Sequence, residues 1–127
     1  MKKTLILSIL FIGVSLAHAQ KTSKVNSQHG TSTQQDKHIE VNGIGHNSSY
    51  SLEGGSAEVS GGSNVITING YADKLEVSGT NNTVYVDKVA RVIVEGGNNK
   101  VFYKISPTKT GKPNVSITGV GNSVKKK

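Results

Sequence analysis

The chain has 127 residues, including 15 glycines, no cysteine and a formal net charge of +7 at pH 7. The absence of cysteine excludes a disulfide framework and a lipid-modified cysteine after a leader. The charge does not indicate an organised nucleic-acid surface, because residues 38–124 hold seven basic and seven acidic residues. The basic excess lies at the two ends of the chain, which favours solubility or weak adhesion to anions.

Residues 1–19 have the layout of a secretory signal peptide. A lysine pair precedes an apolar run over residues 5–16, and Ala17 and Ala19 form a small-x-small cleavage site. We therefore expect cleavage before Gln20 and export to the periplasm or the cell exterior of a bacterium. The apolar run is too short to span a bilayer and no second one follows, so we expect no transmembrane segment after cleavage.

Residues 20–37 form a polar segment that contains one aliphatic residue and many serines, threonines and glutamines. Such a segment does not bury enough apolar surface to order itself. The sequence therefore predicts a flexible polar tether over residues 20–37, followed by a folded repeat domain over residues 38–127.

A short unit repeats five times in this domain. The glycines that mark it are 18, 18, 17 and 23 residues apart, and they are Gly43, Gly61, Gly79, Gly96 and Gly119. On each side of a glycine, apolar and polar residues alternate, which is typical of half-buried strands. Each unit therefore predicts a strand, a turn and a second strand, with two residues of each strand facing one interior. The longer last spacing comes from residues 106–113, whose proline and glycine predict a surface loop.

Units this short must stack to enclose a core. The stack is either an antiparallel meander or a solenoid in which each strand pairs in parallel with its copy in the next unit. The solenoid is favoured because the third residue after the glycine is asparagine in four of the five units, and parallel stacking aligns these amides for hydrogen bonding along a ladder. They are Asn64, Asn82, Asn99 and Asn122. We predict an all-β fold, a small parallel β-solenoid (β-helix) of about five coils with 17–23 residues per coil.

The first and last units differ from the others. His46 replaces the ladder asparagine of the first unit, and Lys126 replaces an inward apolar residue of the last. A solenoid otherwise presents open strand edges at its ends. We therefore predict that His46 and Lys126 are end caps and that the chain is a monomer.

Two motifs resemble a known family. They are the repeated Gly-x-x-Asn-x-Val-x-Val unit and, after the loop Gly111-Lys112-Pro113, the closing run Val115-x-Ile117-x-Gly119-x-Gly121-Asn122-x-Val124. Over about residues 39–125 the chain resembles the small secreted bacterial proteins of the domain of unknown function 3060 family. The resemblance implies a repeat β fold and a secreted or envelope location, and it implies no catalytic or binding residue.

The Gly-x-x-Asn unit is also similar to the repeats of curli fibre subunits, which stack as amyloid. Curli repeats carry glutamine two residues before the glycine, where this chain has Val59, Val77 and Val94. This difference, together with Lys126 in the last coil, favours a monomeric module. A curli-like self-assembling fibre subunit is the alternative.

One pair of outward residues is a candidate binding face. Tyr85 and Phe102 occupy equivalent outward positions of adjacent units. An aromatic pair on a solvent face either stacks on sugar rings or a partner protein, or packs across strands and stabilises the sheet.

A column of carboxylates is a candidate cation site. Glu40, Glu58 and Glu76 each lie three residues before a glycine. Three carboxylates at the spacing of adjacent coils either bind a hard cation or are neutralised by basic neighbours such as Lys74 and Arg91, and we favour neutralisation.

No residue cluster has the spacing of a catalytic or metal site. The four histidines lack metal-ligand spacing, no Ser-His-Asp arrangement is present, and the glutamate column lacks the groove that a polysaccharide-cleaving carboxylate pair needs. We therefore predict a non-enzymatic structural or surface-interaction module without a cofactor. An envelope polysaccharide or a surface protein is the candidate partner.

Overall fold

The computed structural model describes residues 29–127, and this part of the chain contains strands and no helix. The strands are β1 (His29–Gln35), β2 (His38–Ile44), β3 (Asn47–Glu53), β4 (Ser56–Gly62), β5 (Val65–Thr80), β6 (Thr83–Gly97), β7 (Lys100–Ile105), β8 (Asn114–Val120) and β9 (Ser123–Lys126). The predicted signal peptide and the first part of the predicted tether lie outside the described residues.

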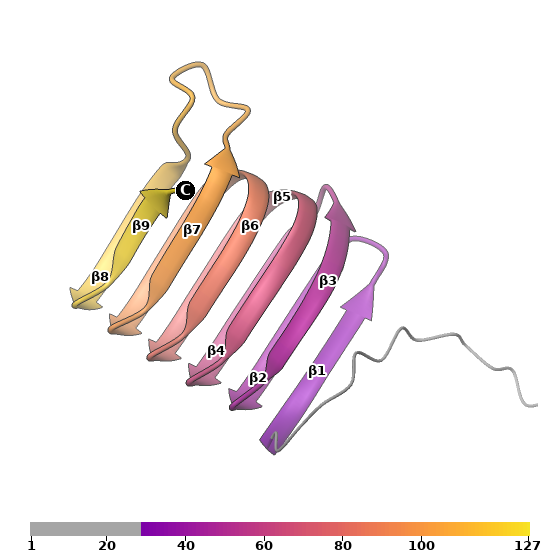
Figure 1. Ribbon diagram of the computed structural model, residues 1–127, viewed down its shortest axis with the longest axis vertical. Helices are drawn as coiled ribbons and strands as arrows, with labels where there is room; N and C mark the ends of the chain where they lie inside the picture. The colour runs from indigo at the N-terminus through magenta and orange to yellow at the C-terminus, as the bar shows by residue number, and fades with distance from the viewer. Residues whose placement is uncertain (1–28) are drawn as a thin grey trace, which may run out of the picture.

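The strands wind into a solenoid with two sheets (Figure 1). One sheet contains β3, β5, β6, β7 and β9, and the other contains β2, β4, β5, β6 and β8. β5 and β6 belong to both, because each follows one sheet, bends and continues along the other. All of these pairings are parallel, so the predicted solenoid is confirmed and the meander is excluded. The coils make about four turns, close to the five predicted.

The core is a stack of the inward residues of successive coils. The two inward residues of each coil strand between residues 39 and 103 are at most 6% exposed. Burial of one such aliphatic side chain stabilises the fold by about 1.5–3 kcal/mol. The core also includes Leu52, Ala72 and Val89, which lie near the second bend and were not predicted.

The repeated glycines form a column at the first bend of each coil. Gly61 pairs with Gly79, and Gly79 with Gly96, at matching positions of adjacent strands. Gly79 has φ of 105°, in the left-handed region that side chains disfavour. A Cβ atom at Gly79 would overlap the carbonyl oxygen of Gly61. The column therefore needs glycine for two reasons, the backbone angle and the close approach of the next coil.

An additional strand lies against the first coil, and here the tether prediction is wrong. β1 falls within residues 20–37 but pairs antiparallel with β2 over seven residues. Its side chains also reach β3, since the Ser32 hydroxyl bonds to that of Tyr50 and the Gln34 amide donates to the Ser51 carbonyl. The segment is ordered without apolar burial because the free edge of β2 offers backbone partners.

The two predicted end caps lie in different surroundings. His46 is 2% exposed and belongs to the buried residues of the first coil. Lys126 is exposed at the last coil and does not cover the core, since Val115 and Ile117 are 45% and 46% exposed. At the N-terminal end the covering element is β1, whereas no described residue covers the C-terminal end. The predicted loop at residues 106–113 joins β7 to β8 and projects from the stack (Figure 1).

Candidate functional site

The asparagine ladder runs through the first bend of successive coils. The Oδ1 atom of Asn82 accepts hydrogen bonds from the backbone N–H of Asn64 at 3.1 Å and from its Nδ2 at 3.0 Å. Asn99 accepts the same two bonds from Asn82, and Asn122 accepts the backbone bond from Asn99. The ladder is present as expected from the sequence, and it stabilises the bend instead of presenting groups to a ligand, because Asn64, Asn82 and Asn99 are completely buried.

The Tyr85 and Phe102 rings lie side by side on the outer face of the sheet that contains β3, β5, β6, β7 and β9. Tyr85 on β6 pairs in register with Phe102 on β7. Their ring centroids are 5.3 Å apart and the planes differ by 16°. Both side chains are half-buried, so part of each ring contacts solvent. The pair satisfies the geometry of aromatic stacking and still offers apolar surface to a second molecule.

A groove of about 210 Å³ surrounds this aromatic pair. Besides the two rings, polar side chains from neighbouring coils line it, namely Thr67, Asn69, Asp87, Lys104 and Lys127. We call this surface the aromatic groove. Its hydroxyl, amide and ammonium groups provide hydrogen-bond donors and acceptors beside an apolar platform, the combination that small-molecule sites use.

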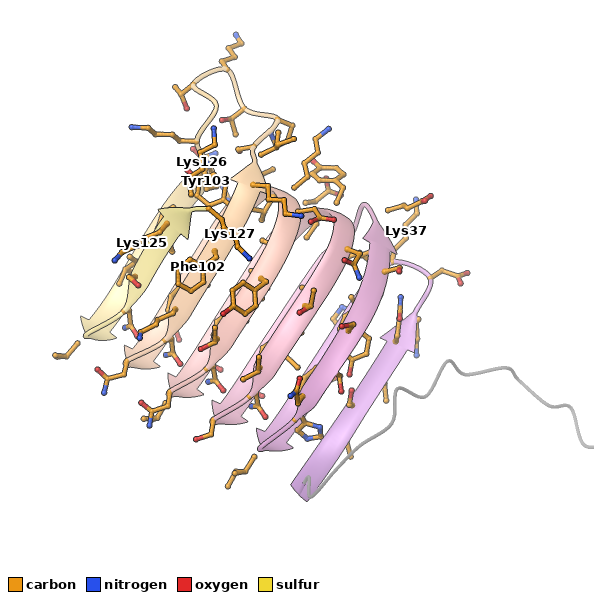
Figure 2. The ribbon with its side chains drawn as sticks, in the orientation of Figure 1. Lys37, Phe102, Tyr103, Lys125, Lys126 and Lys127 are labelled. Carbon is orange, nitrogen blue, oxygen red and sulfur yellow. The ribbon has the colours of Figure 1, made fainter. Side chains whose placement is uncertain are left out.

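Lys127 extends over the groove from the C-terminus. Its backbone N–H donates to the carbonyl of Tyr103 at 2.7 Å, which holds the residue beside the end of β7. Its Nζ atom is 5.0 Å from the centroid of the Tyr85 ring, within range of a cation–π interaction. Figure 2 shows Lys127 near Phe102 on the same face. No salt bridge to Lys127 occurs within residues 29–127, so its ammonium group has no carboxylate partner there.

Lys104, the second cation of the groove, is paired. Its Nζ lies 3.0 Å from an Asp87 oxygen. The pKa of Asp87 is lowered, first because the backbone N–H of Gly70 donates to it at 3.0 Å and then because of Lys104. Asp87 therefore remains ionised at neutral pH and joins adjacent coils.

Asp73, like Asp87, joins adjacent coils through a hydrogen bond. The pKa of Asp73 is lowered, first by a hydrogen bond from the Tyr71 hydroxyl and then by the backbone N–H of Gly55, which lies 2.8 Å away. The hydrogen bond to Asp73 in turn raises the pKa of Tyr71. The Nζ of Lys88 lies 5.2 Å from the Tyr71 centroid. These contacts link coils at the second bend and lie apart from the aromatic groove.

The predicted glutamate column is present as a row in one sheet. Glu40 pairs with Glu58, and Glu58 with Glu76. The Nζ of Lys74 lies 3.1 Å from Glu76, which partly neutralises the row as the sequence suggests. Within residues 29–127, no group of three or more histidine, aspartate or glutamate residues is arranged to hold a metal ion.

The two histidines of the first coil have different surroundings. His38 Nδ1 is 2.8 Å from the Ser56 hydroxyl. The ring nitrogens of His46 have no hydrogen-bond partner among the described residues, and neither has the hydroxyl of Ser48.

A helix long and apolar enough to cross a membrane does not occur in residues 29–127.

Sequence reasoning found the aromatic pair but not the polar side chains around it. Thr67 occupies the equivalent outward position one coil before Tyr85, so the repeat itself places it beside the aromatic pair. Lys127 follows the last strand, and its contact with Tyr85 crosses two coils, so no spacing in the sequence indicates it.

A family model described as Protein of unknown function (DUF3060) matches residues 59–121. No curated protein and no solved structure matches the chain. The matched segment begins in β4 and ends in the turn between β8 and β9, so it includes the aromatic pair and leaves out Lys127.

Proposed function

This chain belongs, through residues 59–121, to the family described as Protein of unknown function (DUF3060), and we propose that it is a non-enzymatic surface-interaction module. It binds a polysaccharide in the aromatic groove. The observation that carries the proposal is the stacked Tyr85 and Phe102 pair, set in a groove with Lys127 over one ring.

The chemistry of a sugar chain fits these groups. The C–H face of a pyranose ring is apolar and packs on aromatic rings, while its hydroxyl groups hydrogen-bond to side chains such as Thr67 and Asn69. The ammonium group of Lys127 favours a sugar that carries an acidic substituent. Coils repeat along the solenoid, so successive sugars of a polymer follow the same direction as the stacked rings.

Binding is expected to depend on both rings. Tyr85→Ala and Phe102→Ala are each expected to weaken binding of an acidic polysaccharide about tenfold, since each removes one stacking contact. The measurement is titration calorimetry with a defined uronic-acid oligosaccharide. Tyr71→Ala is the matched control, because Tyr71 is a half-buried aromatic outside the groove. Binding of Tyr85→Ala with wild-type affinity, or an equal loss in Tyr71→Ala, would contradict the proposal.

We also propose that the protein is exported to the bacterial envelope or cell exterior. The three-part layout of residues 1–19 supports this location. N-terminal sequencing of the chain recovered outside the cytoplasm should give Gln20 as the first residue. A chain that keeps Met1 and stays in the cytoplasmic fraction would refute export.

The curli-like fibre subunit remains a second and less supported candidate. A continuous fibre of this kind needs each coil to stack in parallel on a coil of the next molecule. β1 interrupts such a stack, because it pairs antiparallel with β2 at the first coil. This interruption favours an interaction module over a continuous cross-β fibre.

A further inference from the structure

Charge is distributed unevenly along the solenoid. The first two coils, residues 36–73, carry five acidic residues and one lysine; the acidic residues are Asp36, Glu40, Glu53, Glu58 and Asp73. The last two coils, residues 91–127, carry eight basic residues and only Glu95 as an acidic side chain. Because the coils follow one another along one axis (Figure 1), the solenoid itself, residues 36–127, has an acidic end and a basic end.

The basic end is open. β8 pairs only with β6, and β9 only with β7, so each has a free edge within the described residues. Val115 and Ile117 are nearly half exposed there. A free strand edge beside apolar side chains is a surface that pairs readily with another strand. Figure 2 shows Lys125, Lys126 and Lys127 together at this end.

The acidic end also has a free strand edge. β1 pairs with β2 on one side, and no described residue pairs with its other side. β1 carries no acidic or basic residue other than His29, whereas the exposed Asp36 follows it and the exposed Glu53 ends β3. Lys126 lies in the same column as Tyr50, through the pairings of β3, β5, β6, β7 and β9. Tyr50 in turn lies three residues before Glu53 on β3. The lysines and the carboxylates therefore lie along the same edge of the solenoid.

We propose that the open C-terminal end docks on the N-terminal end of a second copy of this chain. The free edge of β8 would lie against the free edge of β1 of the next copy, and the pair would be antiparallel, as β1 and β2 are. The sheet that contains β9 has one strand fewer, so a gap one strand wide separates β9 from β3 of the next copy. Lys125 and Lys126 stand on opposite faces of β9 beside this gap, and their long side chains would reach across it toward Glu53 of the next copy.

Charge selects this arrangement over a symmetric one. Two C-terminal ends brought together would oppose two sets of lysines, and like charges across an interface cost several kcal/mol. Head-to-tail docking brings the basic end against the acidic end and is open-ended, so short oligomers grow with concentration. The inference concerns the free strand edges at the two ends and does not depend on polysaccharide binding, although Lys125 pairs in register with Phe102 of the aromatic groove.

A charge-swap experiment tests the contact. The protein is the chain from Gln20, studied by sedimentation velocity over a range of concentrations. Wild type is expected to form oligomers whose apparent Kd weakens at least about tenfold when the ionic strength rises from about 0.01 M to about 0.15 M, which shortens the Debye length from about 30 Å to about 8 Å. Lys125→Glu with Lys126→Glu, and separately Asp36→Lys with Glu53→Lys, should each remain monomeric, because each variant places like charges on the two sides of the proposed contact.

A mixture of the two variants decides between specific docking and general charge effects. Mixing should restore oligomers, because each end then meets an end of opposite charge. The matched control for the Lys125 and Lys126 variant is Lys74→Glu with Lys88→Glu, which makes the same change of net charge in the middle coil and should associate like wild type. A concentration-independent wild-type monomer at low salt would overturn the proposal, and so would a mixture that sediments no faster than its components. The wild-type salt series does not depend on the variants being folded.

Discussion

Gly79→Ala is expected to lower the free energy of unfolding by about 4 kcal/mol or more, a large part of the total stability of a small domain. Two costs combine at this position. Alanine at φ of 105° is strained, and its Cβ would overlap the carbonyl oxygen of Gly61 in the preceding coil. That oxygen accepts the hydrogen bond from Asn82 Nδ2 at 3.1 Å, so a shift of Gly61 also disturbs the ladder. Urea denaturation followed by far-UV circular dichroism measures the effect.

Gly111→Ala separates the two costs. Gly111 also has positive φ, at 70°, but a Cβ there would have no atom within 4 Å. Its loss should therefore be only about 1 kcal/mol, the backbone cost alone. Equal destabilisation by the two substitutions would show that close stacking of the glycine column contributes nothing, and would contradict the packing described for the first bend.

The middle coils were predictable because their sequence repeats at the period of the structure. Alternation of apolar residues identifies strands, and a constant spacing brings equivalent residues to the same height only if the strands are parallel. Asn64, Asn82 and Asn99 carried this argument, since a meander would not superimpose them. The same register placed Tyr85 beside Phe102 without knowledge of any contact.

The ends were not predictable because they depend on contacts that no repeat encodes. β1 contains only polar residues and glycine, and its order comes from the edge of β2, a long-range partner. A lysine at the inward position of the last coil suggested a closed end, but Lys126 turns out to be exposed and leaves Ile117 uncovered. The acidic excess of the first coils and the basic excess of the last coils also cancel in the net charge of residues 38–124, which is zero.

We expect the fully buried asparagines of the ladder to contribute more to stability than the asparagine at its open end. Asn82 is 0% exposed, and its side chain makes five hydrogen bonds to neighbouring coils or its own turn. Its Oδ1 accepts from the N–H and Nδ2 of Asn64. Its Nδ2 donates to the carbonyls of Gly61 and Ser78 and to the Oδ1 of Asn99. Asn122 makes the corresponding bonds at the open end, where water replaces a lost partner.

Asn82→Ala should therefore cost about 3 kcal/mol, while Asn122→Ala should cost about 1 kcal/mol or less. Removal of the Asn82 amide leaves the buried N–H of Asn64 without an acceptor, and an unsatisfied buried donor costs about 1–3 kcal/mol in addition to the cavity. Urea denaturation of both variants tests the difference, with hydrogen exchange at the Asn64 amide as a local probe. Equal losses in the two variants, or unchanged exchange at Asn64, would mean that stacked backbones alone hold the bend and that the amide ladder only fills space.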